Sequence, residues 1–484
     1  MPGPSDPNDM LLLGTGPREP PSSLVGGKGA SLFWMASRNL PVPPFFVLTS
    51  IAWQRWNRLR RLDDELLRLV RKGIADLERQ TGAIFGGGPE PLLVSVRSSG
   101  AVSMPGMMDT VLNLGLAPES IAALITRLGD LAALPPILET FLTTFGQAGG
   151  SDETAAVPLS AELQLTQAIE KVFASWNNGR ARLYRTMRRI PEDTGTAVVV
   201  QAMVFGNWDG RSGTGVLFTR NPITGATIPA GEWMAGTQGE AIVSGRMTPA
   251  TLDELALEHP EIYAELHAQA ARIECEAKDA QDVEYTVQSG RLFLLQTRRL
   301  KVTPLAACRI AIDLWHEGII DRLAVSARLR EIDLESLGVD SVEAAGASPL
   351  ATGLPASPGV ASGLTVASSE EAARTAARGH QVVLVRPETS PNDLPGMRSS
   401  VAVITEQGGM TSHAAIVARE LRIPCVVGCG ELSAALDAGT VTVDGGAGRV
   451  FAGERRVHRQ VPAFVLTAQE ILAGRASPSR ATDT

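Results

Sequence analysis

The sequence predicts a mixed α/β protein of several domains, and three observations lead to this prediction. The chain has 484 residues, and at roughly 100 to 200 residues per domain we expect about two to four domains. The composition, with 44% hydrophobic and 20% charged residues, is typical of soluble globular protein. Short β-branched runs alternate along the chain with stretches in which apolar residues recur every three or four positions.

The charge and the cysteines argue against several classes of protein. A formal net charge of −8 without an extended basic stripe argues against a nucleic-acid or anionic-membrane partner. None of the four cysteines belongs to the CxxC pair of a zinc ribbon, so we expect reduced, mostly buried thiols. There is neither a basic segment before an apolar core at the N-terminus nor a run of about 18 apolar residues. We therefore expect a cytoplasmic protein without nucleic-acid or membrane partners.

The chain begins with an arm and a glycine-rich segment. Six prolines before position 22 predict an irregular N-terminal arm over residues 1–21. The segment Gly26-Gly27-Lys28-Gly29 then precedes an apolar helical stretch, Ser31–Arg38. Backbone N–H groups and the ammonium of Lys28 can approach a phosphate at such a helix start. Taken alone, the segment lacks the spacing of a Walker loop and favours a simple turn.

The next motif is an arginine at the end of a strand. A buried-strand pattern over 92–96 leads into Arg97 and then into a methionine-rich loop, 101–110. Guanidinium groups suit bidentate contact with phosphate, so Arg97 is a candidate phosphate ligand. Helical periodicity then runs from Leu116 to about Arg189, interrupted by a small, polar patch at 146–154.

Two further motifs follow a strand predicted over 197–205. The first, Ser212-Gly213-Thr214-Gly215, is predicted as a turn between strands whose main-chain amides lie over a triphosphate. The second is a hairpin around residues 288–291, in which Asp282 and Glu284 share one strand face, as do Gln296 and Arg298. Carboxylate and amide oxygens suit Mg²⁺ and the arginine suits polyphosphate, although a half-exposed polar sheet face explains the same alternation.

The last region carries the candidate catalytic residue. After mostly helical residues 302–343 and a small-residue linker at 344–349, strands are predicted over 382–386, 401–405, 425–427 and 441–444. His413 lies between the second and third of these strands, after a Gly-Gly turn and a Thr-Ser pair that can cap a helix beginning near Ser412. Free N–H groups and the helix dipole favour anions there, which suits a phosphate-receiving nucleophile. An isolated Ser-His pair would more simply be a helix cap.

Together these segments resemble the pyruvate, phosphate dikinase family over about residues 22–460. The motifs that carry the resemblance are GGKGA, SVRSSGAVSMPGMMDTVLNLGL, QAMVFGN with SGTGVLFTRNP, QDVEYT, LQTR, LPASPG, VRPETSP and GGMTSHAAIVAR. Their joint occurrence is highly specific. The TSH triplet and the MPGMMDT loop are similar to the dikinase branch rather than to the phosphoenolpyruvate synthases.

The resemblance implies an ATP-grasp nucleotide-binding domain over 22–300 and a swivelling phosphohistidine domain over 350–455. The residue pattern predicts a helical linker over 301–349 and a C-terminal tail over 456–484 that is frayed after about Ala473. The resemblance also implies contacts to ATP phosphates and Mg²⁺ from Lys28, Arg97, Asp282, Glu284, Gln296 and Arg298, with Glu284 and Gln296 as metal ligands. In the family, the counterpart of His413 attacks the β-phosphorus of ATP and releases AMP. The terminal phosphoryl unit then passes to inorganic phosphate, which leaves phosphohistidine and pyrophosphate. Thr411 matches a position that some members phosphorylate for regulation.

The resemblance leaves the phosphoryl acceptor open. Family members continue as a TIM barrel that binds pyruvate and phosphoenolpyruvate, whereas this sequence ends at Thr484. We therefore expect the acceptor to be pyruvate on a separate barrel subunit, or a small metabolite or antibiotic, as in the related rifampin phosphotransferases. A non-catalytic nucleotide sensor is a third reading. The intact Lys28, Arg97 and His413 favour an active enzyme, because decay would first damage charged positions that do little for packing.

Overall fold

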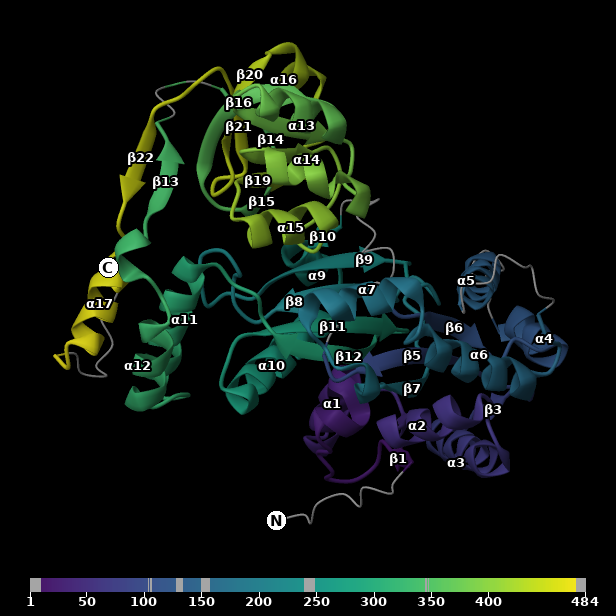
Figure 1. Ribbon diagram of the computed structural model, residues 1–484. Helices are drawn as coiled ribbons and strands as arrows, with labels where there is room; N and C mark the ends of the chain where they lie inside the picture. The colour runs from purple at the N-terminus through teal and green to yellow at the C-terminus, as the bar shows by residue number, and fades with distance from the viewer. Residues whose placement is uncertain are drawn as a thin grey trace. The chain divides into compact units, whose positions relative to one another are not determined.

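Figure 1 shows the computed structural model of the chain, which describes residues 10–102, 104, 107–127, 134–148, 157–238, 249–343, 346 and 348–475. The chain divides into two compact units. The first is formed by Met1–Ser212 and Thr286–Thr297, and the second by Gly213–Tyr285 and Arg298–Thr484. The mixed α/β architecture that the sequence predicts is confirmed. The division does not follow the predicted boundary near residue 300, because the strand hairpin after residue 280 contributes to both units.

The first unit is built on an antiparallel sheet with the strand order β1-β2-β7-β5-β6. Its strands are β1 (Leu11–Leu13), β2 (Phe45–Leu48), β5 (Val94–Gly100), β6 (Thr110–Leu114) and β7 (Thr196–Ala202). All residues of β2 and β7 are buried, in keeping with the apolar sequence of β2 and with the apolar run Ala197–Val200 in β7. The prediction of an irregular arm over 1–21 is wrong for Leu11–Leu13, which form β1. This apolar run pairs with β2 despite the prolines on either side. Residues 1–9 lie outside the described ranges.

Helices cover this sheet, as the periodicity predicts. They are α1 (Ser22–Ser37), α2 (Ser50–Leu59), α3 (Asp64–Thr81), α4 (Pro118–Arg127), α5 (Leu134–Gln147), α6 (Ala161–Ser175) and α7 (Gly179–Arg188), with a short pair of strands, β3 (Ile84–Phe85) and β4 (Pro91–Leu92). In α3, Leu66, Val70 and Leu77 are buried at helical spacing, and the Asp63 side chain caps the helix by accepting from the Leu66 N–H. Of the predicted loop over 146–154, residues 149–154 lie outside the described ranges.

A second sheet has the strand order β10-β9-β8-β11-β12. Its strands are β8 (Gly213–Phe218), β9 (Ala230–Ala235), β10 (Ala250–Thr251), β11 (Gln281–Gln288) and β12 (Arg291–Arg299), with α9 (Leu252–Glu258) and α10 (Pro260–Ala277) between β10 and β11. The predicted hairpin is confirmed. Its turn residues Ser289 and Gly290 have φ angles of 51° and 76°, the left-handed values that a tight two-residue turn requires.

The second unit continues with α11 (Pro304–His316) and α12 (Arg322–Arg330), as predicted for residues 302–343. An antiparallel ribbon of β13 (Val339–Val342) and β22 (Val457–Gln460) lies between these helices and the last sheet, and the two strands run side by side in Figure 1. After the ribbon, α17 (Ala463–Leu472) packs back into the core of α11 and α12. The segment predicted as a C-terminal tail, 456–484, thus contains β22 and α17. Apolar residues at helical spacing, including Val465 and Ala468, bury this helix.

The last sheet has the strand order β14-β21-β20-β16-β17-β18-β19-β15. Its strands are β14 (Ala351–Thr352), β15 (Leu354–Ser357), β16 (Val360–Val366), β17 (Val382–Arg386), β18 (Ala402–Thr405), β19 (Cys425–Val427), β20 (Thr440–Asp444) and β21 (Arg449–Ala452), and its helices are α13 (Ser369–Ala377), α14 (Leu394–Ser399), α15 (His413–Leu421) and α16 (Ser433–Asp437). The strands predicted from the sequence are confirmed. β16 to β19 pair in parallel, and alternate side chains such as Leu384 and Val385 belong to separate cores on the two faces.

Two further features bear on the predictions from composition. No helix within the described ranges is both long enough and apolar enough to cross a membrane. The four cysteines are free, with Cys308 and Cys425 buried, Cys429 half-buried and Cys275 exposed. Burial raises the pKa of the thiols of Cys308, Cys425 and Cys429 to about 12, so these groups stay protonated near neutral pH.

Candidate active site

His413 is the first residue of α15, as the sequence predicts. Ser412 caps the helix, and its Oγ accepts a hydrogen bond of 3.4 Å from the Ala415 N–H. On the inner side of the helix, Ala414, Ala415 and Ala418 are buried against the sheet. The small alanines let the helix lie close to the sheet, while the imidazole stays half-buried at the positive end of the helix.

The imidazole of His413 has a polar partner and a lowered pKa. Thr389 Oγ1 lies 3.1 Å from His413 Nδ1. Burial lowers the pKa of His413 below its usual value of 6.5, and the charge of Asp393 opposes this shift. The ring is therefore neutral near pH 7. In the tautomer in which Nδ1–H donates to Thr389, Nε2 carries the free lone pair of a nucleophile.

The loop before His413 is held by a buried carboxylate that sequence reasoning missed. Glu232, on β9, accepts hydrogen bonds from the Met410 N–H and from Thr411 Oγ1, the latter at 2.5 Å. Glu232 is only 2% exposed. Burial raises its pKa, and the hydrogen bonds from Thr411 and Met410 oppose this shift. The signal in the sequence is a single acid within an otherwise uncharged strand.

Further polar contacts hold α15 within the second unit, and one of them reaches the residues after β12. Lys301 Nζ lies 2.9 Å from Glu420 Oε1. The Arg419 guanidinium donates to the Met410 carbonyl at 2.7 Å and to the Ala356 carbonyl at 3.1 Å. Burial lowers the pKa of Arg419, while the charges of Glu232 and Asp282 are close enough to oppose the shift. Figure 1 shows α15 next to β9 and β10, in agreement with the contacts of Glu232 on β9.

Asp282 and Arg298 come together as the hairpin pattern predicts. Arg298 Nη2 lies 2.7 Å from Asp282 Oδ2, and the charges of Asp282 and Glu284 raise the pKa of Arg298 against the effect of burial. Asp282 Oδ1 is buried and has no hydrogen-bond partner among the described residues. A buried carboxylate oxygen without a donor is costly, so it fits a site in which a bound cation or donor supplies the missing contact.

The predicted contacts Lys28, Arg97 and Gln296 lie in the first unit. Lys28 Nζ donates to the Ser98 carbonyl at 3.2 Å, directly beside Arg97, whose guanidinium donates to Gln201 Oε1. Three residues after Lys28 on the same helix face, Ser31 exchanges hydrogen bonds with the backbone of Thr297, next to Gln296. α1, β5 and β12 thus bring Lys28, Arg97 and Gln296 into one region of this unit.

The glycine-rich start of α1 is built for close approach to β5. Gly26 has a φ of 71° inside the helix, and a Cβ there would collide with the Ser99 carbonyl. Ser99 Oγ accepts from the Gly29 N–H at 3.1 Å and donates to the Val25 carbonyl at 2.8 Å. The glycines therefore set the distance between the Lys28 helix and the Arg97 strand.

The predicted turn at Ser212-Gly213-Thr214-Gly215 is wrong. Residues 213–215 lie in β8, where they are buried and paired with β9. A Cβ at Gly213 would collide with Trp233 and one at Gly215 with Tyr285, so the glycines make room for aromatic rings. Ser212 Oγ donates to Asp209 Oδ1 at 2.7 Å and accepts from the Ser289 N–H at 2.9 Å. These residues thus have structural contacts that account for their types.

The magnesium prediction is not tested by the structure. Within the described ranges, no group of three or more His, Cys, Asp and Glu side chains is placed to hold a metal ion. Glu284 lies on the part of β11 in the second unit, and Gln296 lies on the part of β12 in the first unit. Their assignment as metal ligands therefore stays a prediction.

Comparisons with known proteins agree with these features. A family model described as pyruvate phosphate dikinase, AMP/ATP-binding domain, matches residues 65–261, and one described as PEP-utilising enzyme, mobile domain, matches residues 379–448. A structure of Enzyme I aligns over 46% of this chain and 76% of its own, at 16% identity and a TM-score of 0.14, which is too low to bear on the fold.

Curated relatives cover most of this chain. Pyruvate, phosphate dikinase of Rhizobium meliloti is 39% identical over 89% of this chain and 56% of its own length. Pyruvate, phosphate dikinase 2 of Zea mays is 40% identical over 84% of this chain and 51% of its own, and the Clostridium symbiosum enzyme is 36% identical over 89% and 56%. The chain spans about half the length of these relatives. It belongs to the pyruvate, phosphate dikinase family.

Proposed function

We propose that this chain is an ATP-dependent phosphotransferase that carries a phosphoryl group on His413. In the first step, His413 Nε2 forms a bond to the β-phosphorus of ATP, the bond from that phosphorus to the α-phosphate bridging oxygen breaks, and AMP leaves. In the second step, the terminal phosphoryl unit passes to inorganic phosphate. The products are pyrophosphate and phosphohistidine.

The observation that carries this proposal is the environment of His413. Its pKa is lowered by burial, its Nδ1 has Thr389 as a partner, and it stands at a helix start. The neutral ring leaves a lone pair for attack, and the helix N-terminus favours the anion that forms. Glu232 and Arg419 hold its loop within the unit that also contains Asp282 and Arg298.

Several side chains would together neutralise the negative charge of the ATP phosphates. Phosphoryl transfer depends mainly on positioning and on electrostatic stabilisation of the phosphate oxygens. Lys28, Arg97 and Arg298 would contact the ATP phosphates, and Asp282 would orient Arg298 through their ion pair at 2.7 Å. Glu284 and Gln296 would hold Mg²⁺, which supplies further neutralisation of the β- and γ-phosphates when it is bound.

The fold that we propose for these parts is an ATP-grasp domain followed by a swivelling phosphohistidine domain. Support for the swivel comes from the ribbon of β13 and β22, through which the chain enters and leaves the last sheet. A paired ribbon has few contacts of its own, so rotation about it costs little packing. The contacts of Glu232 with the histidine loop would then hold the domain in the loading position.

The acceptor that we propose is pyruvate, because pyruvate stands in the names of the relatives. In the overall reaction, one ATP would then supply two phosphoryl groups, one to inorganic phosphate and one to pyruvate. We place the pyruvate site on a barrel subunit that acts together with this chain. Transfer of the phosphoryl group to a small molecule by this chain alone, without a barrel, would favour the alternative of a small-metabolite acceptor.

The test is to incubate the purified protein with ATP, Mg²⁺ and inorganic phosphate, then weigh the intact protein and assay AMP. We expect a gain of one phosphoryl mass that is absent from His413→Ala. The phosphorylated protein is then chased with pyruvate, alone and with a pyruvate-binding barrel of a relative. Loss of the phosphoryl mass only with both would support the pyruvate assignment, and equal AMP release by wild type and His413→Ala would contradict the phosphohistidine mechanism.

A further inference from the structure

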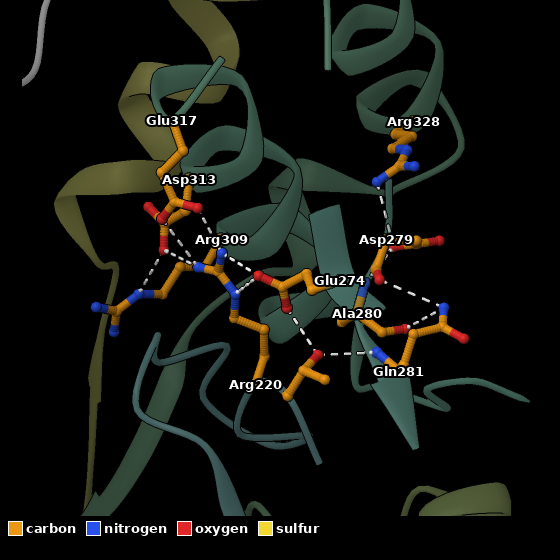
Figure 2. Close-up of polar contacts among 10 residues, drawn as sticks. Arg220, Glu274, Asp279, Ala280, Gln281, Arg309, Asp313, Glu317 and Arg328 are labelled. Atoms are coloured by element: carbon orange, nitrogen blue, oxygen red, sulfur yellow. Dashed lines mark hydrogen bonds and ion pairs between the residues drawn. The ribbon is translucent and has the colours of Figure 1, made fainter. Parts of the chain in front are cut away.

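A buried polar network lies at the beginning of β11, the strand that carries Asp282 and Glu284. Figure 2 shows Arg220 between carboxylates of α10 and α11, and Gln281 beside Asp279. All of these residues belong to the second unit. The mechanism proposed above uses none of the residues in this network.

Arg220 is the centre of the network. Its side chain is only 3% exposed, and its Nη2 lies 2.5 Å from Glu274 Oε1 and 2.6 Å from Glu317 Oε2. The Arg220 Nε also donates to Glu274 Oε1, at 2.8 Å. Burial alone would lower the pKa of Arg220, but the hydrogen bonds and charges of Glu274 and Glu317 raise it, so the guanidinium stays charged.

The hydroxyl group of Thr219 connects Glu274 to the beginning of β11. Thr219 Oγ1 donates to Glu274 Oε2 at 2.7 Å, and the same oxygen accepts from the Gln281 N–H at 2.9 Å. The Thr219 N–H donates in turn to the Gln281 carbonyl, also at 2.9 Å. Both backbone groups of the first residue of β11 are thus fixed from Thr219, one residue before Asp282.

The Gln281 side chain closes the network on its other side. Its amide Nε2 donates to the Ala280 carbonyl at 3.1 Å and to the Asp279 carbonyl at 3.3 Å. Nη1 of Arg328, on α12, lies 3.2 Å from Asp279 Oδ1. The beginning of β11 is therefore connected to α10, α11 and α12.

We propose that Thr219, with Glu274 and Arg220 behind it, is a positioning residue for the phosphate and metal site on β11. This inference rests on the proposed function, because it takes Asp282 as the residue that orients Arg298 toward the ATP phosphates and Glu284 as a ligand of Mg²⁺. A small displacement of Gln281 would shift both carboxylates, and the groups of a binding site must be held within about 0.5 Å of their productive positions. Loss of the Thr219 hydroxyl would therefore weaken the binding of Mg²⁺ with ATP.

The test compares Thr219→Val with Thr219→Ser. Valine keeps the shape but removes the hydroxyl, whereas serine keeps the hydroxyl. We expect Thr219→Val to raise the dissociation constant for Mg²⁺ with a non-hydrolysable ATP analogue by about threefold to tenfold, with KM for Mg·ATP rising in parallel and kcat little changed. Thr219→Ser should stay within about twofold of wild type, and amide exchange of Gln281 should quicken in the valine variant only.

A destabilised control separates positioning from general stability. Val325→Ala removes buried carbons from the core of α11, α12 and α17 without touching the network. If it lowers the melting temperature as much as Thr219→Val and leaves the dissociation constant unchanged, the effect of Thr219 is on position. Equal weakening in both variants, or unchanged affinity in Thr219→Val, would overturn the inference.

The readouts also separate this inference from the proposed function. Binding of the ATP analogue requires no turnover, so a wild type that binds it without AMP release would refute the proposed function while the variant comparison still decides the role of Thr219. A wild type that does not bind the analogue with Mg²⁺ would overturn both.

Discussion

Glu232→Gln is predicted to release the loop that precedes His413. The carboxylate accepts from the Met410 N–H and from Thr411 Oγ1 and is 2% exposed. Glutamine has nearly the same shape, but it has one acceptor oxygen where the carboxylate has two. Its NH₂ group would face either the Met410 N–H or the Thr411 hydroxyl, which are themselves the donors in the wild type. One hydrogen bond to a charged group is therefore lost.

The size of the effect follows from that lost bond. Hydrogen bonds to charged groups contribute about 1.5–3 kcal/mol, and about 1.4 kcal/mol corresponds to a tenfold change in an equilibrium. We expect local opening of the loop to rise by roughly tenfold to a hundredfold. Hydrogen exchange of the Met410 amide, measured by mass spectrometry or NMR near pH 7, reports this opening directly.

The pH dependence of this contact has a definite sign. Because burial raises the pKa of Glu232 above its usual 4.5, its contribution to stability is complete below that pH and decreases as the pH rises through the raised pKa. Glu232→Gln should remove this part of the pH profile. Glu420→Gln is the control, since its partner Lys301 is exposed and such pairs contribute about 0–1 kcal/mol. Met410 exchange in Glu232→Gln within twofold of that control would refute the reasoning.

Three other predictions follow from the site and its sheets. Thr389→Val should slow phosphorylation of His413 by about tenfold or more in single turnover, because Nδ1 loses its partner, and Thr389→Ser should restore it; equal rates would contradict the tautomer assignment. Because the pKa of His413 is lowered below 6.5, the rate of His413 phosphorylation should stay constant down to pH 6.5 and fall only as the pH decreases through the lowered pKa. The stability contributed by the neutral ring should be lost over the same pH range. A fall in rate that begins above pH 6.5 would contradict the lowered pKa. Gly215→Ala should lower the free energy of unfolding by about 1–3 kcal/mol in a denaturant titration, because the added Cβ would collide with Tyr285. Gly210→Ala is the control, since Gly210 has open space around it. Equal denaturation midpoints for the two variants would mean that β8 is packed differently.

The features that the sequence predicts well are local. The cap at Ser412, the hairpin turn at Ser289-Gly290 and the buried strands from 382 to 444 each depend on neighbouring residues, so spacing and turn chemistry suffice to find them. The convergence of Lys28 and Arg97 is long-range, and only the resemblance to a family predicted it. The structure supports it through the contact of Lys28 with Ser98.

The features that the sequence could not predict depend on distant partners. Glu232 and Thr411 are 179 positions apart, and nothing near either residue signals the other. The glycines of Gly213-Thr214-Gly215 suggest a turn, but their function is to leave room for Trp233 and Tyr285, which come from other strands. The strand β1 and the helix α17 were missed because proline-rich and polar flanks hide short apolar runs whose partners lie far away in the sequence.

The most direct test of phosphohistidine formation from the β-phosphate is to label ATP at one phosphate at a time. The protein is mixed with Mg²⁺, inorganic phosphate and ATP labelled with ³²P at either the β or the γ position, and protein-bound label is measured after denaturation in alkali, where phosphohistidine survives. We expect label on the protein from the β position only, no protein-bound label in His413→Ala, and label from the γ position in pyrophosphate. Stable label from the γ position, or equal β-label on His413→Ala, would contradict it.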